Sequence, residues 1–129
     1  MYALQTLIGG GLDTYNAVAA LVRWLGLSFR TVACGDLRTT DAESAVVLAG
    51  WVHRRRDHGN LVFIDLRDSH GIVQVVFNPE LSSDAHSVAE AFRSEWVVQV
   101  EGQVRIRPAG TENPDLPTGG VEVYASEAV

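Results

Sequence analysis

The sequence predicts an all-β domain with one or two helices and an N-terminal helical extension. Three observations support this class. Between residues 46 and 77, apolar runs alternate with turn residues, as in a β-meander. A helical period then interrupts the strands at 82–93, and two more apolar runs follow. The chain of 129 residues, 47% hydrophobic and 20% charged, has the size and composition of one folded domain.

The composition excludes several classes of protein. No run approaches the roughly 18 consecutive apolar residues that a membrane-spanning helix needs. The N-terminus has no positively charged region and is interrupted by Asp13, unlike a secretory signal, so we expect a cytoplasmic protein without membrane contact. The single cysteine, Cys34, cannot form an internal disulfide and has no neighbours at metal-ligand spacing. We expect it to be a buried, unreactive thiol.

The charge distribution is compatible with nucleic-acid binding despite a net charge of −6. Phosphate binding depends on lysine and arginine, and all ten basic residues here are arginine. Three are contiguous at 54–56, and Arg105 and Arg107 form a second group. An acidic domain can still present one arginine-rich face. We therefore expect weak non-specific binding and a dependence on specific contacts.

The first element is predicted in a separate segment, residues 1–32. Gly9, Gly10 and Gly11 interrupt any earlier element. Apolar residues at positions 17, 18, 21, 24 and 25 then have helical spacing. This pattern predicts a short amphipathic helix over 14–25, ahead of a domain formed by residues 33–129.

Three strands open that domain. The predicted strands are 46–53, 61–67 and 72–77, separated by turns at 57–60 and 68–71 that are rich in Asp, Gly and Asn. Strict alternation fails in the first strand, because Arg54 and Arg56 share the parity of Val52. A bulge at Gly50 is expected to reset the register.

A helix and two strands complete the domain. Residues 85, 88, 89 and 92 form one apolar helical face within 82–93, with Ser82 or Ser83 as the N-cap. The fourth strand is predicted at 96–107 with a bulge or bend at Gly102, and a long loop at 108–120 leads to the fifth at 121–125. This order is that of an OB-fold, a five-stranded Greek-key barrel whose second and third strands bind oligonucleotides. Other small barrels share the order.

Side-chain alternation places one aromatic ring and one amide on the outer face. The inward positions are Val62, Ile64 and Leu66 on the second strand, and Val73, Val75 and Phe77 on the third. Phe63 and Gln74 then point outward on adjacent strands. Recognition of single-stranded RNA uses such a pair, because the ring stacks on a base for roughly 1–3 kcal/mol and the amide binds a base edge. Alternatively, Phe63 covers a small core under the N-terminal helix, and Gln74 is an ordinary solvated residue.

The arginines are expected to surround this face. Arg54, Arg55 and Arg56 end the first strand at its rim, where they would contact phosphates. Arg105 and Arg107 alternate with Ile106 and should also project outward. Alternatively, the run at 54–56 is simply a solvated strand end. No nucleophile motif, phosphate-binding glycine loop or metal-binding histidine pair is present, which indicates a binding domain rather than a catalytic one.

Several motifs resemble bacterial aspartyl-tRNA synthetases over residues 33–127. They are CGDLR at 34–38, GWVHRRRDHGNLVFIDLRD at 50–68, GIVQVVFNP at 71–79, RIRP at 105–108, NP at 113–114 and TG at 118–119. The resemblance implies an N-terminal OB-fold domain that binds the anticodon loop of tRNA(Asp), whose anticodon is G/Q-U-C. Residues 1–30 do not share the resemblance.

The resemblance also implies residue roles. Phe63 would stack on the central U, while Gln74 and Arg56 would read bases. Arg54 would contact the loop backbone or a neighbouring base. Around the first anticodon position would lie Arg107, Asn113 and Glu122. His58 resembles the non-discriminating branch of the family, which charges tRNA(Asn) as well as tRNA(Asp).

In this family the OB-fold domain precedes a catalytic domain that binds ATP, Mg²⁺ and aspartate, and the enzyme is a homodimer. The catalytic residues have no counterpart in this sequence, so we expect the chain to bind tRNA, to need no cofactor and to catalyse no reaction alone. Two alternatives stay open: a free-standing OB-fold that binds single-stranded nucleic acid without sequence preference, and a protein-interaction domain that uses the N-terminal helix.

Overall fold

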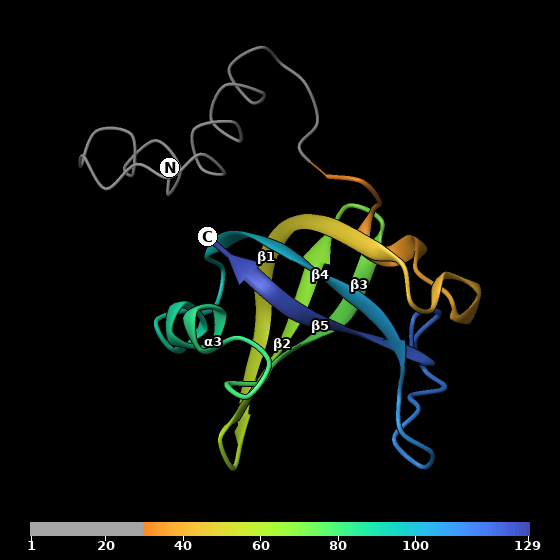
Figure 1. Cartoon of the computed structure of the whole chain (residues 1–129). Coiled ribbons are helices and arrows are strands. Elements are labelled where there is room, and N and C mark those ends of the chain that lie inside the picture. Colours follow the sequence, from red (N-terminus) through yellow and green to blue (C-terminus); the bar gives the residue numbers. More distant parts are fainter. Residues whose placement is uncertain (1–29) are drawn as a thin grey trace.

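The computed structural model of the chain describes residues 30–129, and the helix expected over 14–25 lies outside this part. The described elements are two 3₁₀ turns, η1 (Cys34–Asp36) and η2 (Thr39–Asp41), the strands β1 (Ala45–His58), β2 (Leu61–Asp68), β3 (Gly71–Phe77), β4 (Val97–Ile106) and β5 (Val121–Ala128), and the helix α3 (Ser83–Glu90). The strands form a closed barrel in the order β1-β2-β3-β5-β4 (Figure 1). The predicted five-stranded OB-fold barrel is confirmed.

The long strand β1 closes the barrel because it pairs with two neighbours. Residues 45–51 pair with β4, and residues 51–58 pair with β2, both in antiparallel orientation. β3 and β5 are parallel, whereas β4 and β5 are antiparallel. In Figure 1 the β1–β2 hairpin and the segment after β4 both extend downward from the barrel. These two projections border the candidate site.

The hairpin is longer than the sequence predicted. β1 continues through the arginine run to His58, and the turn is confined to Gly59 and Asn60, with Gly59 at φ 62°. Because His58 pairs with Leu61 through the backbone, polar side chains do not prevent the strand from continuing. β5 likewise extends beyond its predicted end to Ala128.

The helix α3 is shorter than the predicted span of 82–93. Ser82 is its N-cap, as expected, and its Oγ accepts a hydrogen bond from the Ala85 amide at 3.2 Å. After Glu90 the chain leaves the helix, but Phe92 stays buried and meets the Phe77 ring edge-on at 6.0 Å. Within residues 30–129, no helix has the length and apolar character needed to cross a membrane.

The barrel core follows the predicted alternation. All six inward residues of β2 and β3 are buried, and Cys34 from η1 joins the same core with no exposed surface. Burial and the neighbouring Asp68 raise the pKa of the Cys34 thiol, so the thiol stays protonated. The expectation of a buried cysteine is confirmed.

The bulge in β1 lies at His53, so the prediction of a bulge at Gly50 is wrong. The register shifts between Val52 and Arg54 in the pairing with β2. Gly50 instead lies against β2, where a Cβ would collide with the Arg67 carbonyl oxygen. The shift brings Arg54 opposite Asp65. The β4–β5 register also shifts between Glu101 and Gly102, where the sequence predicted a bulge or bend, but the extra residue is Ser126 of β5 and not Gly102.

Candidate nucleic-acid interface

The outer faces of β2 and β3 carry the aromatic ring and the amide together, as the alternation predicted. Phe63 pairs with Val76, and Asp65 pairs with Gln74, so all four side chains belong to the face opposite the core. Phe63 is half-buried, with its ring at the surface near the hairpin. Its neighbour across the hairpin is Arg56.

Gln74 is more enclosed than the sequence suggested, because its side chain belongs to a polar network and is not free in water. The residue is only 8% exposed. Its Oε1 accepts a hydrogen bond from Arg56 at 2.9 Å, and its Nε2 donates one to Glu122 at 2.9 Å. The cause is the parallel pairing of β3 with β5, which brings Glu122 beside Gln74 from 48 residues away. One amide hydrogen and one lone pair of Gln74 remain for a ligand.

Arg56 connects this network to the ring. Its guanidinium carbon lies 6.0 Å from the centroid of the Phe63 ring, within the range of a cation–π contact. The same group forms an ion pair with Asp65 at 3.2 Å in addition to its bond to Gln74. About 43% of the Arg56 side chain is still exposed, so it can meet a ligand without leaving its partners.

Arg107 faces the same hollow but is far less exposed than its predicted outward position implied. Its Nε donates to the Val121 carbonyl oxygen at 2.9 Å, and Nη1 donates to the Thr111 carbonyl oxygen at 3.4 Å. Burial lowers the pKa of the Arg107 guanidinium, and Glu122 partly opposes this effect. Ile106, expected to alternate inward, is 58% exposed at the end of β4. Arg105 does project outward and lies 5.5 Å from the Tyr124 ring.

These side chains line a hollow of about 510 Å³ between the hairpin and the loop after β4. We call it the base hollow, and its lining residues are Arg56, Asp57, His58, Phe63, Gln74, Arg107 and Thr111. Glu122 lies behind Gln74. Three predicted site residues are not in the lining: Glu122, Arg54 and Asn113, whose Oδ1 accepts a hydrogen bond from the Asp115 amide at 3.0 Å. Thr111 was not foreseen, because it belongs to a loop with no periodic pattern.

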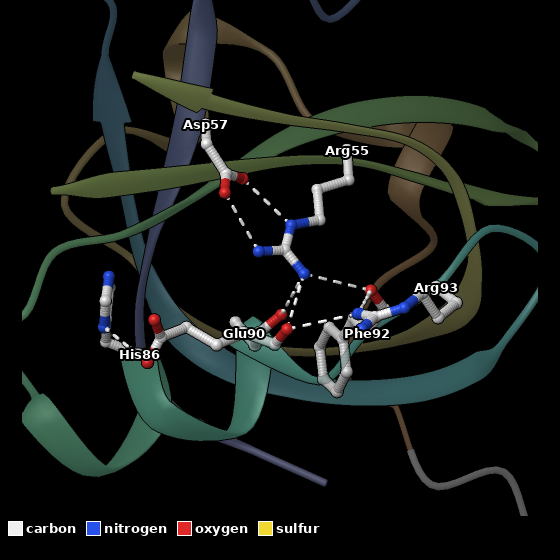
Figure 2. Close-up of polar contacts among 7 residues, drawn as sticks. Arg55, Asp57, His86, Glu90, Phe92 and Arg93 are labelled. Atoms are coloured by element: carbon white, nitrogen blue, oxygen red, sulfur yellow. Dashed lines mark hydrogen bonds and ion pairs between the residues drawn. The ribbon is translucent and has the colours of Figure 1, made fainter. Parts of the chain in front are cut away.

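Arg55 does not border the base hollow, which corrects its expected place on the rim. It pairs with the inward residue Ile64, so its side chain turns toward the end of α3 (Figure 2). There Nη1 donates to the carbonyl oxygens of Glu90 at 2.6 Å and Phe92 at 3.1 Å. Its other nitrogens form a two-pronged ion pair with Asp57 at 2.9 and 3.0 Å. The last carbonyls of a helix lack partners within the helix and attract a cation.

The arrangement suits a planar, anionic ligand. A half-buried ring at the surface, two guanidinium groups and a fixed carboxamide supply stacking, charge and base-edge hydrogen bonding in one place. Across residues 30–129 there is no group of three His, Cys, Asp or Glu side chains that could hold a metal ion.

Comparison with known proteins agrees with this geometry. The sequence model of the family described as an OB-fold nucleic acid binding domain, which is named for the tRNA anticodon, matches residues 46–129. The chain belongs to this family. This OB-fold nucleic acid binding domain is 57% identical over 99 residues to the Aspartate–tRNA(Asp/Asn) ligase of Methylobacterium nodulans. It is 54% identical over 99 residues to that of Beijerinckia indica. Each match covers 77% of this chain but only 16% of the relative.

A solved structure supports the same assignment of fold. The asparaginyl-tRNA synthetase from Pyrococcus horikoshii, in complex with asparaginyl-adenylate, superposes with a TM-score of 0.66 at 29% identity. The similarity covers 79% of this chain and 22% of that protein. This OB-fold domain therefore resembles one part of longer proteins in both comparisons.

Proposed function

We propose that this chain is the anticodon-binding domain of an aspartate–tRNA ligase and that it binds the anticodon loop of tRNA(Asp). The observation that carries the proposal is the contact of Arg56 with both the Phe63 ring and the Gln74 carboxamide at the mouth of one hollow. The similarity to ligases whose names specify tRNA(Asp/Asn) supports the same function.

Each predicted residue has a role in this proposal. Phe63 stacks on the central anticodon base, and Arg56 and Gln74 bind base edges. Arg54 contacts the backbone of the loop. The first anticodon base is surrounded by Arg107, Asn113 and Glu122. Glu122 is buried, which is compatible with two roles: it can orient Gln74 and Arg107, and it can contact the base.

A direct titration tests the proposal. The full 129-residue chain would be titrated with fluorescent anticodon stem-loops, one with the loop sequence G-U-C and one with a scrambled loop. We expect clear preference for G-U-C at low salt. Equal affinity for any pyrimidine-rich strand would indicate a free-standing single-strand binder instead. Absence of RNA binding at low salt would favour a protein-interaction domain.

His58 supports a finer proposal, that the domain accepts tRNA(Asn) as well as tRNA(Asp). Its side chain is exposed and lines the base hollow at the tip of the hairpin. The anticodons of the two tRNAs differ in their third base. Because the domain accepts both in this proposal, the G-U-C and G-U-U stem-loops should bind with similar affinity. A variant His58→Leu should separate the two affinities. If the wild-type chain already prefers one loop by tenfold or more, the finer proposal is wrong.

Activity belongs to a longer protein in this proposal, because the chain spans about one sixth of the length of its curated relatives. Aminoacylation with ATP and Mg²⁺, a homodimeric assembly and a cytoplasmic location are proposed for that longer protein. The domain itself contributes selection of the tRNA.

A further inference from the structure

A second hollow lies on the other side of the arginine run, between β1 and the end of α3. Its volume is about 460 Å³, and its lining residues are His53, Arg54, Arg55, Glu90, Phe92, Arg93 and Ser94. We call it the helix-end hollow. Figure 2 shows how Arg55, Glu90, Phe92 and Arg93 converge there. Three of the chain's ten arginines meet at this place in a protein whose net charge is −6.

Two of these arginines have donors that no group within residues 30–129 occupies. Arg54 is exposed, and within residues 30–129 it has no hydrogen-bond or ion-pair partner. Arg93 uses Nη1 alone, which donates to the carbonyl oxygens of Glu90 at 3.2 Å and Phe92 at 2.9 Å. This anchor restricts the guanidinium, while Nε and Nη2 stay available. His53 is also exposed, because the bulge turns it out of the regular pairing.

The charges in the hollow do not cancel. Arg55 is balanced by its two-pronged pair with Asp57. The remaining acidic group is Glu90, whose carboxylate lies 3.7 Å from Nδ1 of His86, its neighbour one helical turn away. Arg54 and Arg93 therefore face one carboxylate, and the hollow favours an anion.

The two hollows are lined by neighbouring residues of β1. Because the bulge precedes Arg54, this residue and Arg56 share one side of the strand, about 7 Å apart at roughly 3.3 Å per residue. Arg56 lines the base hollow, and Arg54 lines the helix-end hollow. A nucleotide strand with a base against Phe63 can therefore carry its phosphates past Arg54 toward Arg93.

We infer that the helix-end hollow is a phosphate site for the RNA backbone next to the bases held by Phe63, with Arg54 and Arg93 as its principal donors. This inference rests on the proposed function. It assigns to α3 a part in binding through Arg93, a residue just beyond its C-terminal end. Arg93 makes an affinity contact that carries no sequence information, because phosphates are common to all loops.

The test compares Arg93→Gln with the wild-type chain, using the G-U-C and scrambled stem-loops between 50 and 200 mM salt. Affinity for G-U-C should fall about three- to tenfold at low salt, and the slope of log K against log salt should become less steep by about 0.7, the value for one phosphate contact on a single strand. The ratio of affinities for the two loops should not change. Arg67→Gln is the matched control, since Arg67 is an exposed arginine of β2 outside both hollows.

Arg54→Gln provides a second variant, which removes no hydrogen bond or ion pair among residues 30–129. It should reduce the salt slope by a similar amount with no change in the free energy of unfolding. An unchanged slope in Arg93→Gln would overturn the inference while leaving the proposed function intact, and so would a loss of loop preference, because Arg93 would then act through the base hollow. If the wild-type chain shows no preference for G-U-C, the proposed function and this inference both fail.

Discussion

The Arg56 guanidinium donates a hydrogen bond to the Gln74 carboxamide oxygen at 2.9 Å, and Gln74 donates in turn to Glu122. One polar chain thus joins β1, β3 and β5 across the outer face of the barrel. Hydrogen bonds in such a chain strengthen one another where water is largely excluded. The carboxamide is therefore held in one orientation before any base arrives.

Replacement of Gln74 by Glu should destabilise the domain, because a carboxylate would replace the amide that donates to the buried Glu122. We expect the free energy of unfolding to fall by about 2 kcal/mol at pH 8. In the variant, the carboxyl at position 74 and the Glu122 carboxyl lie side by side, and one of the two should have a raised pKa. The stability gained by protonating that carboxyl in the folded state is present below about pH 4 and lost as the pH rises. Urea denaturation between pH 4 and 8 should show a deficit that grows with pH.

The matched control for that experiment is Gln103→Glu on the outer face of β4. Oε1 of Gln103 already accepts a hydrogen bond from Arg105 at 2.9 Å, so a carboxylate there keeps a cationic partner. It should cost less than about 1 kcal/mol at any of these pH values. Equal effects of the two substitutions would show that Glu122 does not depend on the Gln74 amide.

Replacement of Phe63 by Ala should weaken binding of the G-U-C stem-loop about 5- to 150-fold, the equivalent of about 1–3 kcal/mol for one stacked base. Phe63→Tyr keeps the ring and should bind nearly as the wild type. Phe63→Leu keeps an apolar side chain but no π face, and should bind like Phe63→Ala. Fluorescence titration gives the affinities. If Phe63→Leu bound as tightly as the wild type, stacking would be excluded as the role of Phe63.

Replacement of Arg55 by Met should lower the free energy of unfolding by about 1–3 kcal/mol, because charge-assisted hydrogen bonds to the end of α3 are lost. The side chain is only 20% exposed, and its bond to the Glu90 carbonyl oxygen is 2.6 Å long. Arg54→Met serves as the comparison, since Arg54 is exposed and has no hydrogen-bond or ion-pair partner in the described part of the chain, and should change the stability by less than about 0.5 kcal/mol. Urea midpoints that shift equally for both would contradict the role given to Arg55.

Asp68 should make the stability of the domain depend on pH in the acidic range. Its Oδ2 accepts hydrogen bonds from the Cys34 amide and the Arg30 guanidinium, each at 2.8 Å, and its Oδ1 accepts from the His70 amide at 2.8 Å. Burial raises the pKa of Asp68, but the hydrogen bonds from the Cys34 and His70 amides outweigh it and hold the pKa below its usual value.

Because the folded pKa of Asp68 lies below the unfolded one, its carboxylate stabilises the fold above about pH 4, and this contribution is lost as the pH falls through the folded pKa. Asp68→Asn should therefore cost about 2 kcal/mol at pH 7, with a deficit that shrinks toward pH 2. Asp115→Asn, at an exposed loop carboxylate, should change little. A deficit for Asp68→Asn that stays constant from pH 7 to 2 would contradict this account.

Local patterns in the sequence predicted much of the fold. The alternation in β2 and β3 predicts the core residues and places Phe63 outside, and Ser82, one of two predicted N-cap candidates, is the N-cap of α3. These features depend on residues that are close in the sequence, whose geometry follows from the period of a strand or helix. The end of β1 was harder to predict from the sequence. Polar residues such as Asp57 remain in a strand only when a partner strand supplies the backbone hydrogen bonds.

The sequence by itself determined that a ring and an amide share an outer face, and that arginines lie close to them. Only the tertiary structure decided which arginine lines which surface. The register shift at His53 places Arg56 opposite Phe63, and Arg55 instead donates a hydrogen bond to the end of α3. It also decided that Glu122 accepts a hydrogen bond from Gln74. The reason is physical, because barrel closure and bulge position arise from pairing between strands distant in the sequence, and no local period encodes that pairing.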